Sequence, residues 1–470
     1  MLITLSAYAK MHGKNPESAR KKAARGGFKT AQKTGHTWLI DSEDPYDDLR
    51  QKEHAAPEEG QLSFAFPQKA DGSFRAALFD ELEPIYPDTN VSGGVSAYTV
   101  AGCNGTYAGV QIAVSGLTPG IPLTFHVEGP HRAYKLFEMI PIPADSPTGF
   151  TDRAARLVFD ELSSMGYKPV FTNKGGVLCK VSDGDTEDGL ILTAHIDTLG
   201  GMVSCVKENG RLKFTDLGGF SPQSTETENC LIYTRDGKTF EGTIQLVNAS
   251  FHVNKDYHKT ERGFDNVEIV LDEDVASADD VKALGIETGC IVCFEPRTRI
   301  TKSGYIKSRF LDDKLSVAIL LAFAKQVKES SSLPPRAVWL HFTVFEEVGH
   351  GGCASVPEGV SEMLCIDMGC VGEGLSCTER EVSICVKDST GPYHYGMTNT
   401  LIALAKEQNI RYAVDVYPFY GSDADAALRA GHDLRHALIG AGVYASHGYE
   451  RSHKDGAENT FRLICAYAYR

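Results

Sequence analysis

The chain has 470 residues, 42% hydrophobic and 23% charged, which is the composition of a soluble globular protein. This length exceeds one ordinary hydrophobic core, so two to four domains are expected. The net charge of −15 argues against nonspecific binding of the whole chain to nucleic acid or anionic membranes. No apolar run has the length of a membrane span, and no charged leader precedes an apolar core, so we expect a cytoplasmic protein.

The first 50 residues are basic, with eight Lys or Arg residues and a single acid, Glu17, between residues 10 and 33. They predict a short helix, a turn near residue 12, a second helix from about residue 16, and a small ribbon ending near residue 40. This segment resembles the helix-turn-helix modules of excisionase and MerR-type proteins, which implies DNA binding by the second helix. The alternative is a small solvated helical cap. The basic residues of that helix are Arg20, Lys21, Lys22 and Arg25.

Residues 51–60 belong to an acidic, proline-containing stretch that is typical of a linker. Residues 61–132 contain short apolar runs separated by Gly, Pro, Asn and Asp, as in "GVQIAVSGLTPGIPLTFHVEG". This pattern predicts a small β-sandwich, and it leaves open whether that domain is a binding module or a spacer.

Residues 133–203 and 310–470 alternate helical patterns with apolar runs such as "LILTAH" and "VWLHFTVF", which predicts an α/β layer fold. In the first helix Thr151 can cap the start and Gly166 can end it. The apolar face of this helix comprises Ala154, Val158, Leu162 and Met165.

Residues 204–309 interrupt this alternation with β-rich segments. Hairpin signals occur at Asn209-Gly210 and Asp236-Gly237, so we predict an inserted β-barrel. A Cys-x-x-Cys pair in this region, Cys290 and Cys293, lies in an apolar run without a second pair. A buried strand is therefore favoured there over a metal or redox site.

Polar side chains follow or adjoin the apolar runs of the α/β section. These are His195 and Asp197, then Asp312 and Asp313, then Glu346 and Glu347, then Asp367, and finally His453. Because the carboxyl ends of strands form the ligand crevice of open α/β sheets, these groups are expected to converge. If "FTVFEEVG" is a strand, its alternation turns the two adjacent glutamates toward opposite faces.

Several carboxylates in one crevice raise one another's pKa, and divalent cations remove that repulsion. Two imidazoles and three carboxylates suit a pair of Zn²⁺, Co²⁺ or Mn²⁺ ions, with one carboxylate bridging them. Each motif alone has an ordinary explanation, such as helix capping for Asp-Asp or a solvated face for Glu-Glu. Their combination predicts a metal centre.

Six motifs carry a resemblance to a known family: "AHIDTLGGMV", "SRFLDDKLSVAILL", "FEEVGHGG", "CIDMG", "YGSDADAALRAG" and "SHGYERSHKDG". From about residue 133 to the C-terminus the chain resembles the TET-type zinc aminopeptidases, metallopeptidase family forty-two. The resemblance implies a three-layer zinc-exopeptidase sheet with helices on both faces. It also implies an inserted β-barrel for dimerisation, a homo-oligomer and a peptide substrate.

The resemblance further implies roles for the polar residues. Two metal ions share Asp312 as a bridge. The ligand sets are His195, Asp312 and Asp367 for one ion, and Asp312, Glu347 and His453 for the other. Glu346 is the implied general base, Asp197 the residue that orients His195, and a cis peptide is expected between Asp312 and Asp313.

Two features depart from the family pattern or remain open. Lys314 stands where many family members have arginine, which implies weaker anchoring. Ser422 and Asp423 match a family motif and either line the pocket or cap a helix. The first 132 residues have no counterpart in the family core and leave the oligomeric state open.

Three functional hypotheses follow. The first is a dinuclear-metal aminopeptidase that acts on short peptides. The second is another metal-dependent hydrolase on the same scaffold, such as a deacylase, a carboxypeptidase or a glycan-degrading enzyme. The third is a DNA-binding regulator that uses the fold as a sensor. The enzyme is favoured because every implied catalytic position is filled.

Overall fold

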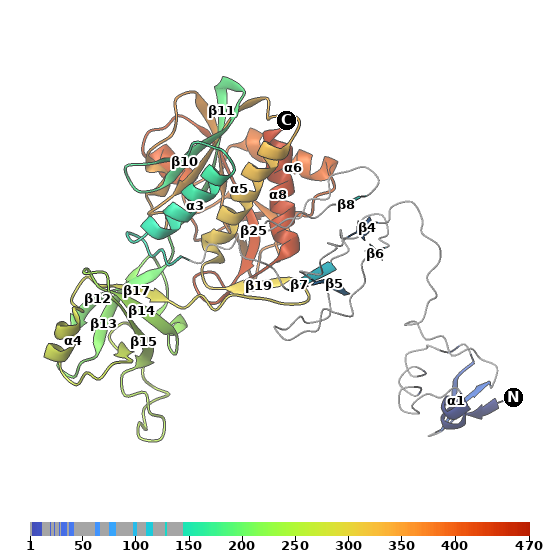
Figure 1. The fold of residues 1–470 in the computed structure, drawn as a ribbon, viewed down its shortest axis with the longest axis horizontal. Coiled ribbons are helices and arrows are strands. Elements are labelled where there is room, and N and C mark those ends of the chain that lie inside the picture. Colours follow the sequence, from blue (N-terminus) through green and yellow to red (C-terminus); the bar gives the residue numbers. More distant parts are fainter. Residues whose placement is uncertain are drawn as a thin grey trace. The chain divides into compact units, whose positions relative to one another are not determined.

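The structure, a computed structural model, divides the chain into two units, Met1–Tyr134 and Lys135–Arg470, which we describe separately (Figure 1). The described residues are 2–11, 19, 23, 28, 30–34, 37–41, 62–65, 75–80, 97–100, 110–115, 127–128 and 144–470.

The described residues at the start of the first unit include a small three-stranded sheet and the helix α1. Strand β1 (Leu2–Thr4) leads directly into α1 (Leu5–Met11), and β3 (Thr37–Asp41) pairs antiparallel with both β1 and β2 (Gln32–Thr34). Seven apolar residues form the core of this module: Leu5, Tyr8, Ala9, Ala19, Ala23, Phe28 and Ile40. The basic residues proposed to face DNA lie outside the described residues, so DNA binding stays a prediction.

The remaining strands of the first unit form two antiparallel groups. One is β6-β4-β8, made by Ala97–Val100, Leu62–Ala65 and Val127–Glu128. The other is the pair β5 (Arg75–Asp80) and β7 (Val110–Ser115). Two antiparallel groups are what a small sandwich requires, and the sandwich itself stays a prediction.

The second unit is built on a twelve-stranded mixed sheet with the order β18-β19-β26-β25-β21-β11-β20-β10-β9, to which β22, β23 and β24 attach. Strands β20, β11, β21 and β25 are parallel neighbours, so their carboxyl ends lie at one edge. The strands of this sheet are β9 (Val170–Phe171), β10 (Val177–Asp183), β11 (Asp185–His195), β18 (Arg299–Ile300), β19 (Tyr305–Ser308), β20 (Arg336–Thr343), β21 (Val360–Ile366), β22 (Gly369–Val371), β23 (Val382–Lys387), β24 (Tyr412–Val416), β25 (Arg435–Tyr444) and β26 (Glu450–His453).

Helices cover both faces of this sheet, as predicted. Successive residues of the central strand β11 alternate between two cores: Leu190 and Leu192 enter the larger one, and Ile191 enters the smaller one. The larger core is closed by α3 (Asp152–Ser164), α5 (Leu311–Glu329), α6 (Tyr395–Glu407) and α8 (Lys454–Ala468). The smaller core is closed by α7 (Asp423–Arg429). Figure 1 shows α3, α5 and α8 side by side over the sheet.

The first helix of this unit matches its prediction except at its start. Ala154, Val158 and Leu162 are buried, and Gly166 follows the helix with a φ of 82°. Thr151 occupies the cap position, but its side chain makes no capping hydrogen bond, because its backbone is already near-helical at φ −107° and ψ −6°. In the part of the chain described, no helix is long and apolar enough to cross a membrane.

The insertion between β11 and α5 is a closed barrel, as predicted, with the strand order β12-β13-β16-β15-β14-β17. The predicted turns at Asn209-Gly210 and Asp236-Gly237 join β12 to β13 and β14 to β15. The barrel comprises β12 (Gly200–Val206), β13 (Leu212–Leu217), β14 (Asn229–Tyr233), β15 (Thr239–Leu246), β16 (Val267–Leu271) and β17 (Ile291–Phe294), with the helices η2 (Pro222–Ser224) and α4 (Ala278–Leu284) in its connections.

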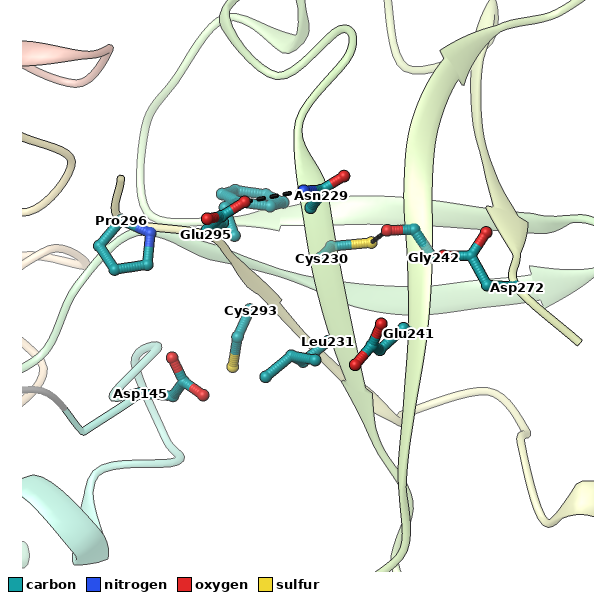
Figure 2. Close-up of a pocket in the computed structure, with 11 residues that line it drawn as sticks. Asp145, Asn229, Cys230, Leu231, Glu241, Gly242, Asp272, Cys293, Glu295 and Pro296 are labelled. Atoms are coloured by element: carbon teal, nitrogen blue, oxygen red, sulfur yellow. Dashed lines mark hydrogen bonds between the residues drawn. The ribbon is translucent and has the colours of Figure 1, made fainter. Parts of the chain in front are cut away.

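Both cysteines of the Cys-x-x-Cys pair are buried, Cys293 within β17 and Cys290 directly before it, in agreement with the strand interpretation. Cys290 packs in the barrel core, whereas Cys293 lines a cavity of about 340 Å³ outside it (Figure 2). Four carboxylates share the lining of this cavity: Asp145, Glu241, Asp272 and Glu295.

Candidate metal centre

The carboxyl ends of the parallel strands converge on one polar cluster. His195 ends β11, Asp367 follows β21, and the Glu346–Glu347 pair follows β20. Asp312 reaches the same place from the start of α5, where the Asp312-Asp313 peptide is cis, as expected from the resemblance. The structure therefore brings together five of the six residues predicted to bind metal or to act as the base.

Asp312 lies between two imidazoles. Its Oδ1 is 3.0 Å from His195 Nε2, and its Oδ2 is 3.2 Å from Nε2 of His447, a residue that the sequence analysis did not single out. Each imidazole also faces one of the paired glutamates. The His195 Nε2 to Glu346 Oε2 distance is 3.7 Å, and the His447 Nε2 to Glu347 Oε2 distance is 3.8 Å.

The sequence suggested that strand alternation turns the paired glutamates to opposite faces. The structure shows that they are not in a strand. Strand β20 ends at Thr343, and Phe345 adopts a left-handed backbone with φ 69°. The following turn is closed by the Gly349 N–H, which donates to the Glu346 carbonyl at 2.6 Å. This turn, rather than the pleat of a strand, directs Glu346 toward His195 and Glu347 toward His447.

His453 lies outside the cluster, so the structure does not support it as a metal ligand. Its Nε2 is 2.7 Å from the Ser303 carbonyl, and its Nδ1 accepts the Asp455 N–H at 3.0 Å at the start of α8. Its ring also packs edge-on against Tyr305, with 4.9 Å between the centroids. Both ring nitrogens are thus used by the fold itself.

A signal for His447 was present in the sequence. The rule that ligands follow apolar runs points to the histidine after "HALIGAGVY", which is His447, and not to one that precedes a helix. In the structure His447 follows β25 by three residues and has a φ of 60°. The left-handed turn that aims its ring at Asp312 leaves no periodic pattern in the sequence.

Burial and mutual repulsion shift the titration of the cluster. Burial raises the pKa values of Glu346 and Glu347 well above the ordinary value, and neighbouring carboxylates add to the effect. Burial and then Asp312 raise the pKa of Asp367 to about 7. Burial lowers the pKa of His447, but the hydrogen bond to Asp312 outweighs it and raises the pKa to about 10.

The residues present fit divalent cations. Oδ1 of Asp313 and Oε1 of Glu347 are buried and accept no hydrogen bond from any described residue. An unsatisfied buried carboxylate oxygen is costly unless a cation binds it. Two groups of donor atoms each lie within 4.8 Å of one another, and imidazole with carboxylate is a donor set that suits Zn²⁺, Co²⁺ or Mn²⁺. These groups are His195, Asp313 and Asp367, and His195, Asp312 and Glu347.

Asp197 supports the cluster in two ways. Its backbone carbonyl lies 2.8 Å from His195 Nδ1, which leaves Nε2 of that ring facing the cluster. Its carboxylate accepts the N–H groups of Glu346 at 3.1 Å and Glu347 at 3.4 Å, and the Thr148 hydroxyl at 2.7 Å. The predicted orientation of His195 therefore comes mainly from the backbone, while the side chain holds the glutamate turn.

Glu450 likewise supports the cluster through backbone hydrogen bonds. It is buried and accepts the N–H of Asp312 and the N–H of His447, each at 3.1 Å. Burial and then Asp312 raise its pKa to about 8. One side chain thus fixes the backbones of two residues that face each other.

The remaining residues of the sequence motifs have structural contacts as well. Lys314 is held through a hydrogen bond that its ammonium donates to the Ala144 carbonyl, which agrees with the weaker, single-point anchoring expected of lysine. Ser422 is the N-cap residue of α7, and its N–H donates to the Asp425 carboxylate at 3.1 Å as in a capping box. Asp423 accepts the Gly352 N–H at 2.7 Å, and both Ser422 and Asp423 line the cavity at the site. Both interpretations of this motif therefore hold.

Comparison with known proteins agrees with this architecture. The M42 glutamyl aminopeptidase family matches residues 175–463. YhfE, a candidate aminopeptidase of Bacillus subtilis strain 168, is 44% identical over 330 residues, which cover 70% of this chain and 95% of YhfE. The TET1 peptidase of Pyrococcus horikoshii superposes with a TM-score of 0.62 at 19% identity, covering 70% of this chain and 97% of that one.

The fold and the family together define a metal-dependent aminopeptidase, a hydrolase of peptide bonds. The chain belongs to the M42 glutamyl aminopeptidase family. The glutamyl aminopeptidase of Lactococcus lactis is a more distant relative, 24% identical over 209 residues that cover 44% of this chain and 57% of that protein.

Proposed function

We propose that the chain removes N-terminal residues from peptides with two divalent ions and Glu346 as the general base. His195, Asp312 and Asp367 would hold one ion, and Asp312, Glu347 and His447 the other. His447 replaces His453 in this set because its Nε2 lies 3.2 Å from Asp312 Oδ2, whereas both ring nitrogens of His453 contact groups outside the cluster. The observation that carries the proposal is that both carboxylate oxygens of Asp312 face an imidazole nitrogen, at 3.0 and 3.2 Å.

When bound, divalent ions lower the pKa of water and polarise the scissile carbonyl. The protein supplies the proton transfers. The Glu346 carboxylate accepts a proton from the attacking water, whose oxygen bonds to the scissile carbon. As the C–N bond breaks, the same carboxyl returns the proton to the leaving amine.

The experiment compares Glu346→Gln with wild type on aminoacyl-nitroanilides and short peptides, with the metal content of both determined. We expect both proteins to hold two ions per chain, and the variant to lose about 10²–10⁴-fold in kcat because general base catalysis contributes that much. A variant that stays within tenfold of wild type would exclude Glu346 as the base. Wild type that holds two ions but cleaves no peptide would exclude the proposed substrate class.

We also propose that the chain self-associates. The TET1 peptidase of Pyrococcus horikoshii, whose fold this chain shares, can assemble into a tetrahedron or a large octahedral shell. Light scattering of the full chain tests this: a species larger than one chain is expected, and a monomer at micromolar concentration would contradict the proposal.

A further inference from the structure

The cavity at the candidate metal centre has a volume of about 510 Å³ and walls of unequal character. One part is anionic and contains Asp312, Glu346, Glu347 and Asp367. Apolar and aromatic groups form much of the remaining wall: Met368, Cys370, Phe419 and Tyr420. Among the residues that line this cavity, Arg429 is the sole Lys or Arg.

Arg429 is held on a well-anchored helix but has no partner of its own. It ends α7, whose Ala424 and Ala427 pack in the smaller core and whose first residue, Asp423, accepts the Gly352 N–H. Within residues 144–470 its guanidinium forms no ion pair or hydrogen bond, in contrast to Arg336, Arg380 and Arg435. A cation in the last turn of a helix is favourable, but this does not explain why it lines the cavity.

The missing ion pair is informative because carboxylates line the same cavity. A guanidinium within 4 Å of any of them would pair with it, so Arg429 is held apart from the metal-binding groups. Arg429 therefore provides an unpaired positive charge at the wall of this cavity. A planar guanidinium with five donors binds a carboxylate through two parallel hydrogen bonds, which is its most specific use.

We propose that Arg429 binds a carboxylate of the peptide substrate and thereby sets substrate preference. This inference rests on the aminopeptidase function proposed above. A cavity of about 510 Å³ holds the first residues of a peptide, so a group on its wall reaches either of two carboxylates. One is the side chain of an N-terminal Asp or Glu, and the other is the C-terminal carboxylate of a dipeptide or tripeptide.

The test uses the full chain loaded with Zn²⁺ and four tripeptides: Glu-Ala-Ala and Gln-Ala-Ala, each as the free acid and as the C-terminal amide. The kcat/KM values are compared for wild type, Arg429→Ala and Arg429→Lys. Arg299→Ala is the matched control, because Arg299 is also an exposed arginine without an ion pair among the described residues, but it does not line the cavity.

Recognition of the side chain predicts that wild type prefers Glu over Gln by about tenfold or more in both acid and amide series, as one charge-assisted hydrogen bond provides. Recognition of the C-terminal carboxylate predicts that wild type prefers the free acid over the amide by a similar factor, whether the first residue is Glu or Gln. In either case Arg429→Ala removes the preference, Arg429→Lys keeps part of it, and Arg299→Ala leaves it unchanged.

If wild type cleaves the peptides but Arg429→Ala keeps the wild-type preferences, or if wild type shows neither preference, the role of Arg429 is refuted while the aminopeptidase function stands. If wild type cleaves none of the four peptides or a neutral Leu-Ala-Ala control, the proposed function itself fails. Unfolding temperatures of the variants, expected to match wild type because Arg429 is exposed, separate a lost contact from a damaged fold.

Discussion

Strand β21 carries a buried carboxylate near each end, and the two have opposite surroundings. Glu362, near the amino end, accepts hydrogen bonds from Arg336 at 2.6 Å, Arg470 at 2.7 Å and the Tyr467 hydroxyl at 2.8 Å. Burial raises its pKa, but Arg336 and the other donors outweigh that effect and lower it. Asp367, just beyond the carboxyl end, lies among other carboxylates, and its pKa is raised to about 7.

The carboxylate at the amino end of β21 therefore stabilises the fold, whereas the carboxylate beyond its carboxyl end belongs to the candidate metal centre. At the amino end the Glu362 carboxylate is paired with Arg336, Arg435 and Arg470, so its ionised form is the stable one. At the carboxyl end the carboxylates are held close together with too few donors, as the bare oxygens of Asp313 and Glu347 show. Such an arrangement costs stability in the absence of cations and is the usual mark of a functional site.

Removal of the Glu362 carboxylate at the amino end of β21 should have the largest effect on the free energy of unfolding. Glu362→Ala leaves the buried Arg336 with only the more distant carboxylate of Asp188, at 4.0 Å, and breaking a buried pair in this way costs about 3–5 kcal/mol. We expect the free energy of unfolding, measured by guanidinium denaturation of the metal-loaded protein, to fall by that amount. Arg435→Ala removes a half-exposed partner of the same carboxylate and should cost about 1 kcal/mol or less. Equal losses in the two variants would contradict this explanation.

Removal of a proposed ligand at the candidate metal centre should lower metal affinity and have little effect on folding. His447→Ala should lower the affinity for Zn²⁺ at least about 100-fold, since removing even a group that merely orients a ligand costs 10–100-fold. His453→Ala is the matched control and should keep both ions while lowering the unfolding temperature, because it loses only the contacts at the start of α8. Titration with a competing chelator measures both. Loss of an ion in His453→Ala alone would restore the original ligand assignment.

A substitution of Glu450 tests whether the hydrogen bonds that hold the backbones of Asp312 and His447 contribute to metal affinity. In Glu450→Gln one carboxylate oxygen becomes an NH2 group, which cannot accept a hydrogen bond. Either the Asp312 N–H or the His447 N–H then loses its acceptor, so the two backbones are no longer both held. Zn²⁺ affinity should fall about 10–100-fold. Glu379→Gln, which changes a partly exposed ion pair with Arg451, should leave the affinity unchanged. An unchanged affinity in Glu450→Gln would show that the two hydrogen bonds are dispensable.

The smallest effect concerns pH. In metal-free protein the raised pKa of Asp367, about 7, gives stability that is present below the unfolded pKa of about 3.9 and is lost as pH rises through 7. The raised pKa of His447, about 10, acts in the same direction, since its contribution declines above about pH 6.5.

Calorimetry of metal-free protein should therefore show the unfolding temperature falling by several degrees between pH 5 and 8. Saturating Zn²⁺ should reduce or reverse this fall, because ions bind the deprotonated ligands. If the unfolding temperature of the metal-free protein rises between pH 5 and 8, the carboxylates of the candidate metal centre do not raise one another's pKa as proposed.

The sequence by itself determined much of the catalytic unit. The alternation of helices and apolar runs predicted the layered sheet, and the Asn-Gly and Asp-Gly pairs predicted two turns of the inserted barrel. The rule that polar groups follow buried strands located His195, Glu346, Glu347 and Asp367 at one edge, and the Asp-Asp pair before a predicted helix added Asp312. These features leave a local or periodic trace in the sequence, because hydrophobic spacing and turn chemistry act over a few residues.

Only the tertiary structure decided how the His447 ring is directed toward Asp312, how the adjacent glutamates divide, and what holds them. Phe345 and His447 adopt left-handed backbones with φ near 60–70°, and one such residue redirects the chain beyond a strand in a way that no periodicity encodes. The supporting contacts of Asp197 and Glu450 join residues up to 150 positions apart. Such pairings depend on the packing of the whole sheet, which is why the sequence could place the site but not complete its list of ligands.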